Sequence, residues 1–231
     1  MIKAVFFDFY NTLISFDPPR QQLQVTACRE FGIEVNPKAI PRGYWFADDF
    51  MSRENARSPI HKRSPEEERT FWADYEAIIL EKAGVEVSKE LALRIFTRAR
   101  QLDRRLILFD DVLPVLDTLK SRGIVLGLVS NLNRKLDGHC QELGLTPYMD
   151  FALTSSEIGA EKPHPPIFLA ALERAAVGAS EAIHVGDQYH SDILGAKSVG
   201  INPLLLDRDG FWEGVEDCPR IRSIAEVENY L

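Results

Sequence analysis

The sequence predicts an α/β fold in which a parallel sheet flanked by helices is interrupted by an all-helical insertion. Three observations lead to this prediction. The chain opens with an apolar run, 4–7, that ends at Asp8; a long helical stretch without strands follows; strands and helices then alternate to the last residues. A continuous apolar run of this kind is typical of a strand buried on both faces, as in a parallel sheet. We therefore expect one sheet, built from segments on both sides of the insertion.

Composition describes an ordinary globular chain. It has 231 residues, of which 45% are hydrophobic and 27% charged, and a net charge of -8. This negative charge argues against nucleic acid or an anionic membrane as the main partner. The N-terminus has no basic-then-apolar leader and no apolar run could span a bilayer, so a cytoplasmic protein is expected. A monomer and a homodimer fit the sequence equally well.

The cysteines indicate a reducing compartment. There are three of them, Cys28, Cys140 and Cys218, and they are too few and too scattered for a disulfide framework or a zinc site. Each is better explained as a small core residue than as a nucleophile.

The stretch 13–19, which is closed by a proline pair, is interpreted as a linker that leads into the insertion. Ser64 followed by Pro65 and two glutamates is a strong helix start, with a serine cap, proline at the first position and acids in the first turn. Helical patterns cover 21–31, 41–54, 65–83 and 88–105. We therefore predict an all-helical cap domain over residues 16–105, and a core domain formed by residues 1–15 and 106–231.

The alternation of strands and helices resumes after Arg105. Buried strands are predicted at 124–129, 151–153, 182–185 and 202–206, and helices at 112–120, 134–143, 167–176, 191–199 and 224–230. Such alternation implies a Rossmann-like parallel sheet with right-handed crossovers. The first strand, 4–7, belongs to the same sheet.

Polar side chains stand where the predicted strands end, or in the loops that follow. They are Asp8 with Thr12, Ser130 with Asn131, Lys162, and Asp187 with Asp192. The carboxyl ends of parallel strands share one edge, so these groups can converge there. Asp8 by itself could equally begin a turn. Two acids at one edge would suit a hard divalent cation such as Mg²⁺. A lysine and a hydroxyl would bind phosphoryl oxygens, and one carboxylate would be available as a nucleophile.

These segments, in this order and spacing, resemble the motifs of the haloacid dehalogenase (HAD) superfamily, most of whose members are Mg²⁺-dependent phosphatases. Residues 8–12 resemble its first motif and 129–131 its second. Lys162-Pro163 resembles its third motif, and 186–192 followed by Gly195-Ala196 resembles its fourth. The helical insertion falls where such families place their first type of cap. Each motif alone is weak, whereas the four together are specific.

The resemblance implies a phosphatase that acts on a small phosphorylated molecule. Asp8 would be the nucleophile and would form an aspartyl-phosphate. Ser130 would hydrogen-bond the phosphoryl oxygen and Lys162 would offset negative charge. Thr12 and Asn131 would position the nucleophile loop and the phosphoryl group.

The resemblance also implies a magnesium site. Asp187 would hold Mg²⁺ together with Asp8 and the main-chain carbonyl of Tyr10. Asp192 would contribute through the shell of the ion or by orienting Lys162.

Tyr10 departs from the phosphatase pattern. Phosphatases of the superfamily carry a second aspartate at this position, which protonates the leaving oxygen and later activates water. Such assistance is typically worth on the order of 10²–10⁴ in rate, and a phenol with a pKa near 10 is a poor base at neutral pH. The carbonyl at this position can still bind a metal.

Three alternatives follow from Tyr10. The 2-haloacid dehalogenases have tyrosine at this position, because a leaving halide needs no proton. They look metal-free, however, and lack an acid equivalent to Asp187. They also carry a cap arginine that receives the halide, and this chain has Trp45 near that position, with Arg42 close by. Phosphonate cleavage would need a Schiff-base lysine, for which Lys62 and Lys82 are nominal candidates. A slow or non-catalytic binding module would keep the fold and the metal.

Two histidines have competing interpretations. His184 lies inside a predicted strand and is interpreted as a satisfied core residue rather than a catalyst. His190 lies in the fourth-motif loop and could donate a proton, although a solvated loop histidine is the simpler interpretation.

Overall fold

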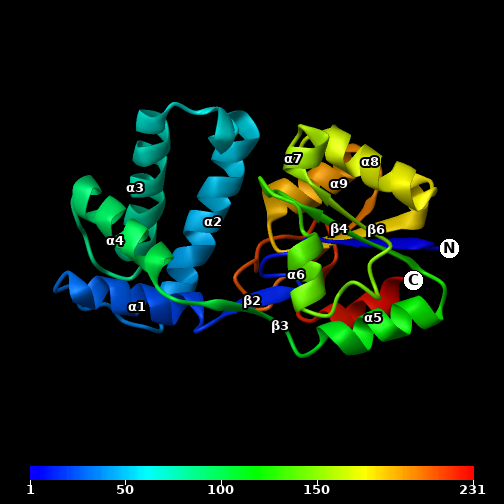
Figure 1. Cartoon of the computed structure of the whole chain (residues 1–231), viewed down its shortest axis with the longest axis horizontal. Coiled ribbons are helices and arrows are strands. Elements are labelled where there is room, and N and C mark those ends of the chain that lie inside the picture. The colour runs from blue at the N-terminus through cyan, green and yellow to red at the C-terminus, as the bar shows by residue number, and fades with distance from the viewer. The chain divides into compact units, whose positions relative to one another are not determined.

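The chain forms two compact units (Figure 1). The computed structural model describes all residues, 1–231. One unit comprises Met1–Ser15 and Ile107–Leu231, and the other comprises Phe16–Leu106. We refer to them as the α/β unit and the helical unit, and describe each by itself.

The α/β unit contains a six-stranded parallel sheet in the order β5-β4-β1-β6-β7-β8. The strands are β1 (Ala4–Phe7), β4 (Val125–Ser130), β5 (Phe151–Thr154), β6 (Ala182–Gly186), β7 (Asn202–Leu206) and β8 (Arg220–Ile221). The parallel sheet predicted from the buried apolar runs is therefore confirmed. Phe7 at the end of β1 is in register with Leu128 of β4 and Val185 of β6. The first strand thus lies in the interior of the sheet, and the residues that follow it emerge between two neighbouring strand ends.

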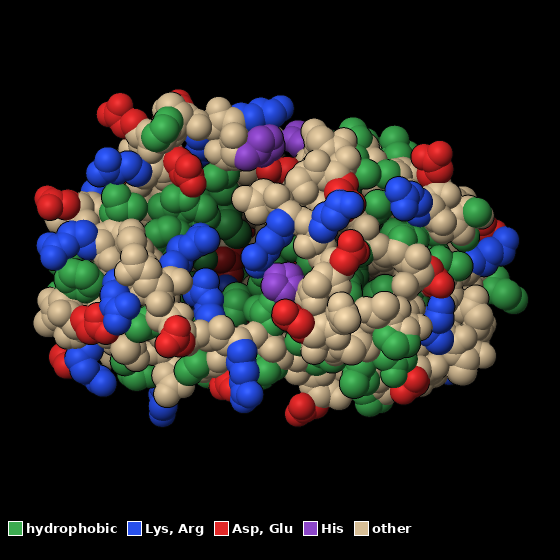
Figure 2. Space-filling view, viewed as in Figure 1, with side chains coloured by type: hydrophobic (Ala, Val, Ile, Leu, Met, Phe, Trp, Pro, Cys, Tyr) green, Lys and Arg blue, Asp and Glu red, His purple; other side chains and the backbone are tan.

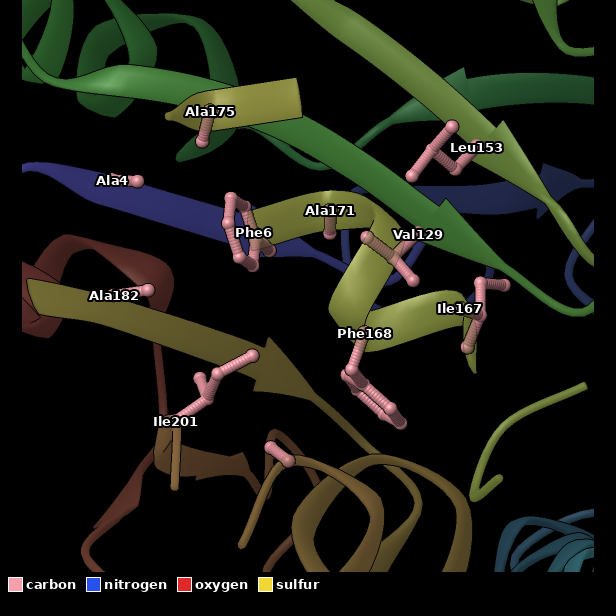
Figure 3. Close-up of a cluster of buried hydrophobic side chains, with 11 residues drawn as sticks. Ala4, Phe6, Val129, Leu153, Ile167, Phe168, Ala171, Ala175, Ala182 and Ile201 are labelled. Atoms are coloured by element: carbon pink, nitrogen blue, oxygen red, sulfur yellow. The ribbon is translucent and has the colours of Figure 1, made fainter. Parts of the chain in front are cut away.

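Helices cover both faces of this sheet (Figure 1). They are α5 (Val112–Ser121), α6 (Asp137–Glu142), α7 (Ser155–Ile158), α8 (Pro165–Ala175), η2 (Ala179–Glu181), η3 (Tyr189–Ile193), α9 (Leu194–Ser198) and η4 (Ile224–Tyr230). Helices α8 and α9 lie on one face, and α5 lies with η4 on the other. Figure 3 shows the core under α8, where Phe6 of β1 lies beside the helix that carries Phe168 and Ala171. This burial fixes β1, and therefore the position of Asp8 after it.

The helical unit contains the four predicted helices. They are α1 (Arg20–Glu30), α2 (Ile40–Arg57), α3 (Pro65–Lys82) and α4 (Lys89–Gln101), with a single 3-10 turn, η1 (Ile60–Lys62). The predicted start of α3 is confirmed: the Glu67 amide donates to the Ser64 hydroxyl at 3.3 Å, and the Ser64 amide donates to the Glu67 carboxylate at 2.8 Å. The helices enclose their own apolar core, which includes Ile40 and Ile79.

Some elements differ from the sequence prediction. The stretch 13–19, predicted to be a linker, contains β2 (Ile14–Asp17), which pairs with β3 (Arg105–Leu108) in a separate two-stranded sheet. Both strands have only four residues and are partly exposed, so they lack the buried apolar run that identifies the others. The helix predicted at 191–199 begins earlier, with the π-helical turn η3, and the last helix is 3-10.

Charged side chains of both signs are interspersed on the face shown in Figure 2. None of the helices combines the length and the apolar character that crossing a membrane requires.

A buried polar network lies inside the helical unit. Gln24 donates to a carboxyl oxygen of Glu76 and accepts a 2.9 Å hydrogen bond from the Tyr44 hydroxyl. Glu76 is 1% exposed, and its burial raises its pKa from 4.5 to about 8 against the opposing effect of the Gln24 hydrogen bond. Glu76 is therefore protonated at neutral pH in the folded chain.

We expect this carboxyl group to make stability depend on pH. Because the folded state retains a proton that the unfolded state releases above pH 4.5, the free energy of unfolding should fall as the pH rises from 4.5 to about 8. The slope contributed by this one group is at most about 1.4 kcal/mol per pH unit. Glu76→Gln should flatten that slope in urea unfolding followed by circular dichroism. Glu90→Gln, at an exposed position of α4, is the control and should leave the slope as it is.

Candidate active site

Asp8 lies directly after β1, at the edge of the sheet where the carboxyl ends of the strands meet. It is 8% exposed, and its amide donates to the carbonyl of Val185 in β6 at 2.9 Å. Ser130 ends β4 on one side of β1, and Asp187 follows β6 on the other. The carboxylates of Asp8 and Asp187 therefore follow adjacent parallel strands at the same edge.

The loop after Asp8 folds back on itself. The amides of Leu13 and Ile14 both donate to the carbonyl of Phe9 at 3.1 Å, and the Asn11 amide donates to the Ile14 carbonyl at 2.9 Å. Asn11 has a φ of 58°, in the left-handed region that asparagine tolerates better than most residues. Thr12 is fully buried within this loop, and its hydroxyl makes no hydrogen bond.

Lys162 connects two buried carboxylates. Its Nζ lies 2.6 Å from Oδ1 of Asp8 and 2.6 Å from Oδ1 of Asp192, and the residue is 2% exposed. Asn131 holds the main chain of this lysine at both polar groups: its Nδ2 donates to the Lys162 carbonyl at 2.9 Å, and its Oδ1 accepts from the Lys162 amide at 2.7 Å. The predicted residues Asp8, Asn131, Lys162 and Asp192 are thus brought together.

Asp192 is held from several sides. Besides Lys162, it accepts from the Gln188 amide at 3.1 Å and lies 2.9 Å from Nε2 of His184. Its side chain packs against Gly186 so closely that a Cβ there would lie 2.1 Å from the Asp192 Cγ. Only glycine fits at position 186. These contacts join Asp192 directly to Lys162, the residue that it is predicted to orient.

His184 is predicted from the sequence to be a core residue, and the structure also connects it to the site. It is fully buried in β6, as expected, but its hydrogen-bond partner is Asp192, so it extends the chain of contacts from Asp8 through Lys162. A histidine inside an otherwise apolar buried strand needs a polar partner. That rule indicates a partner without identifying it.

Three further predicted residues lie at the ends of neighbouring strands or in the loop after Asp8. Ser130 is 3% exposed and lies opposite Thr154 of β5. Tyr10 is half-buried, with its ring edge-on to Phe9 at 5.2 Å between centroids. Asp187 is half-buried, and its carbonyl accepts from Nε1 of Trp212 at 3.1 Å.

Burial and charge shift the pKa values of the network in different directions. Burial raises the pKa of Asp8, in opposition to the charge of Lys162. Burial would also raise the pKa of Asp192, but the charge of Lys162 and the His184 hydrogen bond lower it to about 2. Burial would lower the pKa of Lys162, but Asp192 and Asp8 together raise it. One cation is therefore shared by two carboxylates, and a second cation beside Asp8 would favour its ionised form.

The oxygen groups at this edge are suited to a hard divalent ion. The side chains contain no group of three or more His, Cys, Asp or Glu residues arranged to hold a metal. Mg²⁺ needs fewer, because it is usually bound through one or two carboxylates and keeps several waters. Asp8 and Asp187 are the two carboxylates that follow neighbouring strands, and the carbonyl of Tyr10 is close in sequence to the first.

We expect Lys162→Met to destabilise the chain strongly. Removing the cation leaves two buried carboxylates without their shared partner, which should cost about 3–5 kcal/mol of unfolding free energy at neutral pH. Asp192, with its pKa lowered from 3.8 to about 2, contributes stability above pH 3.8 that is lost as the pH falls through about 2. The difference in unfolding free energy between the parent and Lys162→Met should therefore become smaller as the pH falls from 3.8 to about 2.

Urea unfolding at pH 7 and pH 3 measures this difference. Lys120→Met is the matched control, because Lys120 pairs with Asp150 at 2.8 Å on the surface, where side chains are 34% and 40% exposed. Such a pair contributes about 1 kcal/mol or less. Equal losses of unfolding free energy in both variants at pH 7 would contradict the prediction that Lys162 neutralises two buried carboxylates.

A family model described as haloacid dehalogenase-like hydrolase matches residues 2–200. The chain belongs to this family. It is therefore a hydrolase with the HAD-like fold, and the match includes every site residue predicted from the sequence.

The proteins that this HAD-like hydrolase resembles include both a phosphatase and a dehalogenase. Human haloacid dehalogenase-like hydrolase domain-containing protein 3 is 29% identical over 89% of this chain and 82% of its own length. Ribulose-1,5-bisphosphate 5-phosphatase of Halopiger xanaduensis is 29% identical over 100% of this chain and 95% of its own. A solved 2-haloacid dehalogenase from Pseudomonas syringae pv. Tomato is 27% identical, with a TM-score of 0.58 over 99% of this chain and 97% of the other. Similarity alone therefore does not separate the two chemistries.

Proposed function

We propose that this hydrolase is a Mg²⁺-dependent phosphatase that acts on a small phosphorylated metabolite. The observation that carries the proposal is the position of Asp187, which follows the strand next to Asp8 at the same sheet edge. A second carboxylate there suits a divalent ion, whereas it would repel the carboxylate of a 2-haloacid. The phosphatase named among the relatives supports the same class of substrate.

Asp8 would act as the nucleophile. One of its carboxylate oxygens would bond to phosphorus as the ester oxygen leaves, and water would then attack phosphorus, release inorganic phosphate and restore the carboxylate. Lys162, 2.6 Å from Asp8, would offset the charge of the phosphoryl oxygens. Ser130, at the end of the adjacent strand, would donate a hydrogen bond to one of them. Asn131 keeps Lys162 in place through its main chain.

Mg²⁺ would be held by Asp8, Asp187 and the carbonyl of Tyr10, and would supply positive charge beside the phosphoryl group. Asp192 is assigned to Lys162 rather than to the ion, because its oxygens already accept from Lys162, His184 and Gln188. The helical unit would serve as the cap domain that excludes water during turnover.

We further propose that Tyr10 occupies the position of the second aspartate of HAD phosphatases. A leaving oxygen would then depart without a carboxylic acid to protonate it. Turnover should be fastest on phosphate esters whose leaving groups are stable as anions.

A 2-haloacid dehalogenase is the second candidate, favoured by Tyr10 and by the similarity to the Pseudomonas syringae enzyme. Asp8 would again be the nucleophile, and the halide would leave without a proton. The acid at position 187 weighs against this candidate.

One experiment separates the candidates. Release of p-nitrophenol from p-nitrophenyl phosphate is measured with Mg²⁺ and with EDTA, and halide release from 2-chloropropionate is measured without metal. Metal-dependent p-nitrophenol release is expected. Halide release without metal would replace the phosphatase by the dehalogenase, and neither activity with Mg²⁺ still bound would indicate a binding module.

A further inference from the structure

Two side chains from one short turn reach the main chain of two different site loops. Nη2 of Arg208 donates to the carbonyl of Thr12 at 3.0 Å, in the loop that follows Asp8. Nε1 of Trp212 donates to the carbonyl of Asp187 at 3.1 Å. The turn follows β7, and it lies beyond residue 200, where the family match ends.

The turn is built around Asp207. This residue is 3% exposed, and its carboxylate accepts from the amides of Phe211 at 2.8 Å and Trp212 at 3.3 Å. Arg220 lies 3.5 Å from the same carboxylate and donates to the Trp212 carbonyl at 2.6 Å. The turn therefore has its own hydrogen bonds, which fix the position of Trp212 independently of its contact with Asp187.

The guanidinium of Arg208 is also fixed. It makes two parallel 2.9 Å hydrogen bonds to Asp111 and lies 4.0 Å from the ring centroid of Phe109. Asp111 in turn accepts from the Ser223 hydroxyl at 2.6 Å. A bidentate arginine of this kind has a defined geometry that lysine does not reproduce.

We propose that Arg208 and Trp212 are positioning residues that hold the Asp8 loop and the Asp187 loop at a fixed position relative to each other. Arg208 restrains the first loop at Thr12, and Trp212 restrains the second at Asp187. Because both donors belong to one turn, they fix the two carboxylates relative to each other. The functional part rests on the proposed phosphatase, whereas the restraint of the loops does not.

Hydrogen–deuterium exchange of the full chain tests the restraint without reference to activity. Arg208→Gln should speed exchange in the peptide covering 9–14, and Trp212→Phe should speed it in the peptide covering 187–193, each by roughly 10-fold and each leaving the other peptide unchanged. Arg208→Lys should recover part of the protection, because it retains one donor and the charge. Arg122→Gln is the control: Arg122, which directly follows α5, pairs with Glu228 of η4 at 2.5 Å and contacts neither loop.

Metal binding and kinetics test the positioning. Each variant should weaken Mg²⁺ binding, measured by calorimetry, by roughly 10-fold, because each frees a loop that carries proposed ligands of the ion. Arg208→Gln should also lower kcat at saturating Mg²⁺ by roughly 10–100-fold, because it frees the loop that follows the nucleophile. Loop-specific exchange with unchanged kcat and Mg²⁺ affinity would overturn the positioning role. Exchange that rises equally in both peptides, or rises in the Arg122→Gln control, would overturn the restraint. A parent chain without metal-dependent phosphatase activity would instead refute the proposed function, and the exchange comparison would still decide on the restraint.

Discussion

Replacing Asp8 by asparagine should abolish phosphate release, lowering kcat on p-nitrophenyl phosphate by on the order of 10⁴-fold or more, because the variant has no carboxylate to attack phosphorus. The fold should survive. Asp8 is a buried carboxylate whose pKa is raised by burial, so a neutral amide of the same shape costs little there. Rapid-quench measurement with ³²P-labelled substrate should trap an acid-stable phosphoryl-enzyme in the parent and none in the variant.

Asp103→Asn is the control for this change, since Asp103 is exposed and lies outside the α/β unit. It should keep the parental kcat. An Asp8→Asn chain that retains a tenth of the parental rate would remove Asp8 from the role of nucleophile, whatever the metal dependence.

Tyr10→Asp should raise turnover of alkyl phosphates by on the order of 10²–10⁴. The new carboxyl group would protonate the departing alkoxide and then activate water. The gain on p-nitrophenyl phosphate should be much smaller, because its leaving group is stable as an anion. A plot of log kcat against leaving-group pKa should be steep for the parent and shallow for the variant.

Tyr10→Phe is the matched control, because it removes the phenol and keeps the ring that packs on Phe9. Its kcat should stay within about threefold of the parent, since a phenol contributes little acid–base assistance at neutral pH. A large loss in Tyr10→Phe would show that the hydroxyl itself takes part, and a flat parental plot would show that another group supplies the proton.

The sequence was informative where local pattern and burial coincide. The run at 4–7 is apolar and fully buried, the run at 182–185 is fully buried and apolar apart from His184, and the run at 202–206 is apolar and buried from Leu204 on. Strands buried on both faces have this composition, so their place in a parallel sheet could be predicted. The edge shared by Asp8, Ser130 and Asp187 follows from that topology. Strands β2 and β3 were missed because short, half-exposed strands carry no such run.

The side-chain contacts within the site could not be predicted from the sequence. Lys162 meets Asp8 across 154 residues, and Arg208 meets Thr12 across 196, so no local spacing encodes either contact. Arg208 and Trp212 donate to main-chain carbonyls, which every residue has, and such contacts leave no side-chain pattern to read. His184 gave a partial signal, as a polar residue in an apolar strand.

The interior position of β1 has a consequence for biosynthesis. Its two neighbours are β4, which begins at Val125, and β6, which begins at Ala182. While the ribosome is still adding residues before β6, the apolar strand emerging first has at least one unpaired edge, and the intervening helices can fold ahead of it. Nascent chains that stall in this interval would expose a strand prone to intermolecular pairing. Assembly of this sheet therefore depends on a late-synthesised strand, β6, which is followed directly by Asp187, the proposed second carboxylate of the metal site.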